Sequence, residues 1–148
     1  MNTKVLNRLQ MQCVRREYCV RDIRAKALKA LDGDADAAEE MVSALVADKF
    51  VDDCRYATAF ARDKASLAGW GTFKIRMALQ AKGIASEVID SALGEVDLPS
   101  ADARLDKLVA TRKKALEGDP QQRLKLLRYL LGRGYDYDTV ERAISRCK

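Results

Sequence analysis

A short phrase occurs three times along this chain: a leucine, four residues, and then a bulky apolar residue with a basic residue or glycine just before it. The copies are LVADKF at 45–50, LQAKGI at 79–84 and LLGRGY at 130–135. Each copy is expected to close an amphipathic helix, because Asp or Ser residues that can cap the next helix follow it. The phrase therefore predicts a helix-turn-helix joint repeated along a chain of tandem helical units.

Charge alternates along the chain on the same scale. The net charge is only +5, yet basic and acidic residues are segregated into blocks. The basic blocks cover 1–30, 61–82 and 104–133, and the acidic blocks cover 31–60 and 83–103. If the units stack in register, the basic helices line up as a discontinuous stripe facing a polyanion or an acidic protein groove. The alternative interpretation is that the charges only solvate helix surfaces.

Apolar residues recur at helical spacing from end to end, and only YDYDTV alternates as a strand would. The sequence predicts an all-α fold of nine helices in three tandem three-helix repeats. The expected units are 1–51, 52–95 and 96–148. A chain of 148 residues can bury its cores without disulfide bonds.

Capping residues predict several helix ends. Asp36 begins a D-x-x-E capping signal for the third helix, and Ser86 is expected to cap the sixth. Asp119 and Pro120 fit the N-cap and first position of the eighth helix. The segment 94–100 (GEVDLPS) is the best linker candidate.

The chain contains no histidine, which excludes Ser-His-Asp triads, Cys-His dyads, HExxH sites and Cys2His2 zinc sites. The segment GWGTFK at 69–74 lacks the third glycine of a nucleotide-binding fingerprint and follows a helix. The adjacent Asp52 and Asp53 would point about 100° apart on a helix, and capping explains them better than metal binding does. No catalytic residue, cofactor or metal is predicted.

The cysteines and the hydropathy pattern indicate a compartment. Cys13, Cys19, Cys54 and Cys147 form no CxxC pair, and the first ten residues lack the apolar segment of a secretory leader. No run approaches the ~20 apolar residues that span a bilayer. We expect a cytoplasmic protein with reduced thiols and no membrane partner.

Basic side chains and one tryptophan are the remaining functional candidates. Guanidinium and ammonium groups at this density pair with phosphates or carboxylates. Trp70 either stacks on a base or a partner side chain, or fills the joint between repeats. The candidate binding residues are Arg21, Arg24, Arg55, Arg62, Lys64, Trp70, Lys74, Arg76, Lys82, Lys113, Lys114, Arg123, Lys125 and Arg128.

Two segments carry a family resemblance. VDDCRYA at 51–57 and GWGTFKIRMALQAKGI at 69–84 resemble the signature of the RecX family, bacterial regulators of the RecA recombinase. REYCVRDIRAKAL at 16–28 is similar to the family's first repeat, except that Cys19 replaces an expected serine and so weakens a helix cap. The third repeat matches only in pattern.

The resemblance implies more than the spacing does. RecX-like proteins are elongated, curved arrays of three-helix repeats that lie in the groove of the RecA filament on single-stranded DNA. They suppress ATPase, strand-exchange and coprotease activities, bind without catalysing, and act in DNA repair, recombination and the SOS response. Tyr56, Ile75, Leu79 and Ile84 would then form core, Gly83 a turn and Asp52 a cap. The full set of signature positions carried over as structural is Asp52, Asp53, Tyr56, Ala57, Gly71, Ile75, Leu79, Gly83 and Ile84.

The resulting hypothesis is that a monomer bridges neighbouring RecA protomers or blocks a filament end through the candidate binding residues, with possible weak direct DNA contact. Two alternatives stay open. A direct DNA-binding helical module predicts strong, salt-sensitive binding to bare DNA. A generic α-helical scaffold for another acidic partner predicts no effect on RecA.

Overall fold

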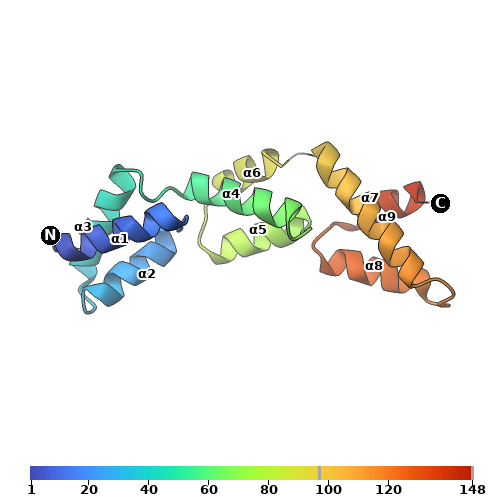
Figure 1. Ribbon diagram of the computed structural model, residues 1–148, viewed down its shortest axis with the longest axis horizontal. Helices are drawn as coiled ribbons and strands as arrows, with labels where there is room; N and C mark the ends of the chain where they lie inside the picture. Colours follow the sequence, from blue (N-terminus) through green and yellow to red (C-terminus); the bar gives the residue numbers. More distant parts are fainter. Residues whose placement is uncertain (97, 148) are drawn as a thin grey trace.

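The computed structural model describes residues 1–96 and 98–147, and within those ranges the chain forms nine α-helices and no strand (Figure 1). The helices lie in three groups of three along one long axis, with the two termini at opposite ends. The predicted all-α fold of tandem three-helix repeats is confirmed. The helices are α1 (Thr3–Arg15), α2 (Val20–Ala30), α3 (Ala35–Ala47), α4 (Asp53–Ser66), α5 (Thr72–Ala81), α6 (Ser86–Gly94), α7 (Leu98–Ala115), α8 (Gln122–Gly132) and α9 (Tyr137–Arg146).

Each group of helices has its own hydrophobic core. Met41 and Leu45 are fully buried among α1–α3, Ile75 and Leu79 among α4–α6, and Leu130 among α7–α9. Nearly all of these contacts stay within one group, as in other repeat arrays. We propose the units 1–51, 52–95 and 96–148 on these clusters, with Cys19 and Val96 packing on the middle core from the neighbouring units.

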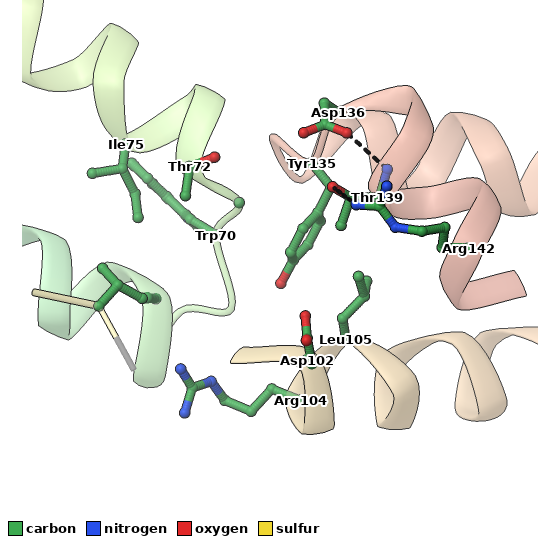
Figure 2. Close-up of a pocket in the computed structure, with 13 residues that line it drawn as sticks. Trp70, Thr72, Ile75, Asp102, Arg104, Leu105, Tyr135, Asp136, Thr139 and Arg142 are labelled. Atoms are coloured by element: carbon green, nitrogen blue, oxygen red, sulfur yellow. Dashed lines mark hydrogen bonds between the residues drawn. The ribbon is translucent and has the colours of Figure 1, made fainter. Parts of the chain in front are cut away.

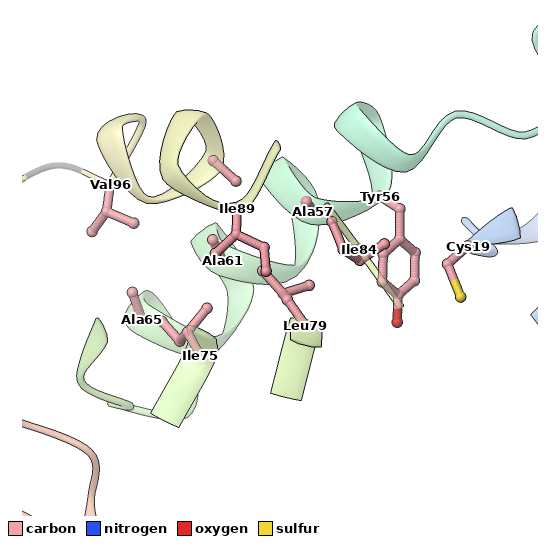
Figure 3. Packing of buried hydrophobic residues seen from close by; sticks show 11 residues of the cluster. Cys19, Tyr56, Ala57, Ala61, Ala65, Ile75, Leu79, Ile84, Ile89 and Val96 are labelled. Atoms are coloured by element: carbon pink, nitrogen blue, oxygen red, sulfur yellow. The ribbon is translucent and has the colours of Figure 1, made fainter. Parts of the chain in front are cut away.

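Small residues on α4 determine how the middle core packs. Ala57, Ala61 and Ala65 are buried at intervals of four residues, so they form one narrow face of α4. Ile75 and Ile89 from α5 and α6 fill the space against that face (Figure 3). Long side chains on the two shorter helices therefore complement a smooth surface on the longest helix of the unit.

The repeated phrase is a helix C-terminal motif. Its fifth residue has a left-handed backbone in all three copies, with φ of 62° at Lys49, 77° at Gly83 and 95° at Gly134. In the first two copies the N–H of the sixth residue donates to the carbonyl of the leucine, at 2.9 and 3.2 Å. This is a Schellman-type ending, which also brings the two apolar anchors together.

The three copies do not occupy equivalent places. The first ends α3 and leads into the next unit, whereas the other two end α5 and α8 and lead to the third helix of the same unit. The α2–α3 turn of the first unit instead contains Asp32 and Gly33, with φ of 55° and 86°. The phrase marks helix ends, because the Schellman ending is a local requirement that any helix of the array can meet.

Three predicted caps need correction. Asp34 rather than Asp36 caps α3, since its carboxylate accepts the Ala37 N–H at 3.1 Å. Ser86 is the first residue of α6, after an Ala85 N-cap without a side-chain bond. Asp119 accepts the Gln121 N–H at 2.8 Å in a turn, and α8 begins only at Gln122. Only α3 has another acidic residue as its cap, because α6 and α8 begin without a side-chain capping bond.

The predicted linker is also shorter than expected. Of the segment 94–100, Gly94 still belongs to α6 and the residues from Leu98 onward belong to α7. Residue 97 lies outside the described residues. Proline is tolerated in the first turn of a helix, where the N–H it lacks would have no intrahelical partner, so Pro99 does not interrupt α7.

The second helices of the units follow one another end to end along one side of the array (Figure 1). We call the contact between the first and middle units the first joint, and the contact between the middle and last units the second joint. At the second joint, the N–H groups of Gly71 and Phe73 at the start of α5 donate to the carbonyls of Arg133 and Gly134 after α8, at 2.9 and 3.0 Å. A Cβ added to Gly71 would overlap the backbone of Gly134, and one added to Gly134 would overlap Lys74. Only glycine permits this approach of two backbones.

Gly71→Ala should therefore weaken the second joint, with a loss of about 1–3 kcal/mol in the free energy of unfolding measured in urea. Gly132→Ala is the matched control, because nothing lies within 4 Å of a Cβ at that helical position. Alanine there should be neutral or slightly stabilising. Equal stability of the two variants would show that the backbone contact does not hold the joint.

Candidate docking surface

The first joint is held by side chains from both units. The C-cap of α5 meets the start of α2, where Arg21 Nη1 donates to the Ala81 carbonyl at 2.6 Å and Lys82 Nζ pairs with Asp22 at 2.9 Å. Lys82 lowers the pKa of the Asp22 carboxyl through this hydrogen bond. Two of the candidate binding residues, Arg21 and Lys82, therefore contact their own chain here.

Asp53 supplies the cap that α2 lacks. Cys19 occupies the N-cap position and makes no side-chain capping bond. Asp53 Oδ1, from the next unit, accepts the Val20 N–H at 2.8 Å, while the adjacent Asp52 caps its own helix by accepting the Arg55 N–H at 3.1 Å. The weak cap expected at Cys19 is thus compensated from a distant part of the sequence. Cys19 itself is buried against Tyr56 of the middle unit (Figure 3), and this burial raises the pKa of its thiol.

Arg55 completes the first joint. Its guanidinium forms an ion pair with Glu17, between α1 and α2, and Nη2 donates to the Phe50 carbonyl at 3.3 Å. The residues of the DDxRYA segment therefore connect the first two units: Asp53 caps α2, Arg55 binds Glu17, and Tyr56 packs on Cys19.

Several candidate bases form ion pairs within one unit. Arg24 and Arg76 hold the second helix to the third in the first two units, and Arg123 does the same in the last. Solvent screens these exposed pairs and keeps them weak, so an external anion can compete for the base. The pairs are Arg24–Glu39, Arg76–Asp90 at 2.8 Å, Arg123–Glu141, Arg62–Glu95 at 3.3 Å and Lys125–Asp119 at 2.6 Å.

Trp70 lies between α4 and α5 with lysines over its ring. Lys64 Nζ is 4.8 Å and Lys74 Nζ 4.5 Å from a ring centroid of the indole, and Phe60 packs edge-to-face at 6.1 Å. The ring is partly buried. It therefore fills space beside the second joint while binding two cations.

The remaining candidates belong to the last unit. Lys113 Nζ donates to the Cys147 carbonyl at 3.1 Å, beyond the end of α9. Lys114 and Arg128 are exposed, and within the described part of the chain neither forms an ion pair. Arg128 lies on α8, whereas Lys113 and Lys114 lie at the end of α7, so the structure does not bring all of the candidates together.

A cavity of about 300 Å³ lies between the middle and last units (Figure 2). Trp70, Ile75, Leu105 and Tyr135 line it, and Arg104 faces it from α7. The Tyr135 hydroxyl donates to the Gly69 carbonyl at 3.1 Å, and burial raises the pKa of that hydroxyl.

Arg133 and Tyr135 contact the neighbouring unit, although neither is among the candidate binding or structural signature residues. Arg133 Nη2 donates to the Ala68 carbonyl at 2.5 Å, beside the Tyr135 contact with the same loop. Arg133 occupies the position in LLGRGY that Lys82 has in LQAKGI, and each residue donates a hydrogen bond to the neighbouring unit. An alignment of the second and third copies of the phrase would therefore have suggested Arg133 as the counterpart of Lys82.

Charge differs between the second and third helices of the units. α5 and α8 contain bases and no acidic residue, whereas α3 and α6 contain acids and no base. α9 is mixed. The row formed by α2, α5 and α8 is therefore the basic side of the array. Within the described ranges no cluster of potential metal ligands occurs, and no helix there is long and apolar enough to cross a membrane.

Three-helix units joined end to end, with a basic row of second helices, define a helical-repeat binding protein. The sequence models of the second and third three-helix domains of RecX match residues 52–93 and 101–144. A "Regulatory protein RecX" of Chromohalobacter salexigens is 31% identical over 131 residues, covering 88% of this chain and 84% of that protein. One of Prosthecochloris aestuarii is 30% identical over 144 residues, covering 95% and 91%. The chain belongs to the RecX family.

Solved structures agree on the fold. The crystal structure of RecX from Lactobacillus salivarius superimposes with a TM-score of 0.84 at 20% identity, over 98% of this chain and 95% of that one. A second crystal structure, of a regulatory protein RecX, gives 0.85 at 23% identity, over 97% and 71%. Similarity at this level of identity supports the three-unit architecture alone.

Asp53→Ala should speed hydrogen exchange of the Val20 amide, because that N–H loses its acceptor. A lost cap costs about 1 kcal/mol, which corresponds to roughly fivefold faster exchange. Asp52→Ala is the matched control and should affect the Arg55 amide instead. Exchange at Val20 that is the same in both variants would contradict a cap supplied across the joint.

The Asp22–Lys82 pair should make stability depend on pH in the acid range. Because the folded-state pKa of Asp22 is lowered, its contribution is complete above the ordinary carboxyl pKa of about 3.9 and is lost as pH falls below it. Asp22→Asn should be less stable than wild type in urea at about pH 7, and the difference should shrink as pH falls through the acid range. In a Lys82→Met background the substitution should have little effect. A difference that persists at low pH would contradict the ion pair.

Proposed function

We propose that this chain regulates the RecA recombinase, mainly as an inhibitor. It binds in the groove or at the end of the RecA filament on single-stranded DNA and suppresses ATPase, strand-exchange and coprotease activities. Family membership over nearly the whole chain supports this proposal. The observation that carries it is the end-to-end row of basic second helices, which presents one elongated surface to a long partner.

The proposed action is mechanical and needs no catalysis or cofactor. A monomer whose joints are held by backbone hydrogen bonds and ion pairs connects neighbouring RecA protomers. Such a connection opposes the subunit motions that accompany ATP turnover, or blocks addition at a filament end. This role places the protein in the cytoplasm, in DNA repair, recombination and the SOS response, with at most weak direct DNA contact.

A direct DNA-binding module is the second candidate. The lysines over Trp70 favour it, because an indole with adjacent cations can stack on a base and bind its phosphate. The acidic α3 and α6 oppose it, as do the ion pairs that engage many of the candidate bases. A scaffold for an unrelated acidic partner is the third possibility.

The deciding measurement is ATP hydrolysis by RecA of the same organism on single-stranded DNA, titrated with this protein beside a binding assay on bare DNA. Inhibition below one molecule per RecA protomer, with little affinity for bare DNA, is expected. No inhibition together with tight, salt-sensitive DNA binding would favour the DNA-binding module. If the protein affects neither assay, the remaining hypothesis is a scaffold for an unrelated acidic partner.

The joint variants test the mechanical part of the proposal. Gly71→Ala should inhibit less than Gly132→Ala at equal concentration, because the first opens the second joint and the second leaves it intact. Equal inhibition by the two variants would show that inhibition does not depend on the second joint.

A further inference from the structure

Apolar side chains lie on the outside of α5 and α8, and two of them, Phe73 and Leu124, occupy equivalent positions in the two helices. Ile75 of α5 and Leu126 of α8 are the equivalent buried residues. Positions two residues before and after each of them lie about 160° away on the helix. In α5 these outward positions hold Phe73 and Met77, which are 61% and 53% exposed. In α8 the first of them holds Leu124, and Leu131 continues the same stripe one turn beyond Arg128.

The second joint brings together the ends of the two helices that carry these stripes. The Gly134 N–H donates to the Leu131 carbonyl at 3.0 Å, and the Gly134 carbonyl accepts the Phe73 N–H at 3.0 Å. One glycine therefore links the backbone at Leu131 to the backbone at Phe73. Four large apolar side chains lie on the two helices that meet there, with Arg128 among them.

The two helices that carry this stripe have charge of a single sign. α5 and α8 carry Lys74, Arg76, Arg123, Lys125 and Arg128, and neither helix contains an acidic residue. Arg76, Arg123 and Lys125 pair with carboxylates outside these helices, so among the described residues Lys74 and Arg128 are the bases of α5 and α8 without an ion pair. Exposed leucine, methionine and phenylalanine at helical spacing have an energetic reason to enter an apolar groove on a protein. Surrounding bases require that such a groove be bordered by carboxylates.

We propose that the outer stripe of α5 and α8, formed by Phe73, Met77, Leu124, Arg128 and Leu131, is a docking surface for an acidic protein face that contains an apolar groove. The inference rests on the proposed function, in which that face belongs to the RecA filament. The apolar side chains are the anchors, and the bases select the partner and its orientation.

The composition of the stripe favours a protein over a nucleic acid. Aliphatic side chains gain nothing from contact with phosphates, and Phe73 is the only residue of the stripe that could stack on a base. A DNA-binding helix row would present Lys or Arg at the positions that Met77, Leu124 and Leu131 occupy. Nucleic acid is therefore the competing occupant that the experiment must exclude.

The test replaces apolar area without changing charge. Phe73→Gln combined with Met77→Gln should raise the concentration needed for half-inhibition of RecA ATP hydrolysis by at least about tenfold, because anchors of this kind dominate binding. Affinity for bare single-stranded DNA should stay within about twofold, since no base is removed. Met11→Gln combined with Val14→Gln on α1 removes exposed apolar area away from the row and should behave as wild type.

Each other outcome overturns the inference in a distinguishable way. Wild-type inhibition by the Phe73/Met77 variant, with circular dichroism unchanged, would refute the stripe and leave the proposed function standing. A parallel loss of affinity for bare DNA would identify nucleic acid as the occupant. Equal losses in the Met11/Val14 variant would show that exposed apolar area anywhere on the array suffices. Absence of inhibition by wild-type protein would overturn the proposed function and the stripe with it.

Discussion

The arrangement of the array depends on contacts between the ends of consecutive second helices. At the second joint these are main-chain hydrogen bonds across Gly71 and Gly134, where neither position has room for a side chain. At the first joint Arg21 and Lys82 connect the ends of α2 and α5 through their side chains. Both joints place the positive end of one helix dipole near the negative end of the next. The row of α2, α5 and α8 therefore has one polarity along its length.

Many of the basic residues form contacts within the array itself. Arg21, Arg55 and Lys82 contact groups of their own chain across the first joint, and others pair with acids on a third helix. The count of bases therefore overstates the charge available to a partner. Apolar residues on the outside of α5 and α8 have no such internal partners among the described residues, so they supply anchors where the bases supply selectivity.

The accuracy of the sequence predictions depended on how local the underlying interaction is. Apolar spacing located all nine helices of the described chain, because burial of one helix face is a property of a single segment. The predicted caps Asp36, Ser86 and Asp119 are wrong, because the residue at which a helix begins is set by the path of the backbone: Asp34 caps α3, and α6 and α8 begin without a side-chain capping bond. The sequence does not distinguish the places of the three copies of the leucine phrase, because a Schellman ending has the same local pattern at the end of any helix.

The sequence by itself determined the helical class, the three-unit periodicity, the family and the segregation of charge, since each is written in the order of neighbouring residues. Tertiary structure decided which charged groups are already paired, that Asp53 caps a helix of the preceding unit, and that the ends of α5 and α8 meet at Gly134. At the two joints the partners are far apart in sequence: 33 positions for Asp53 and Val20, and 65 for Arg133 and Ala68. These partners are selected by the packing of whole units, which no local pattern encodes.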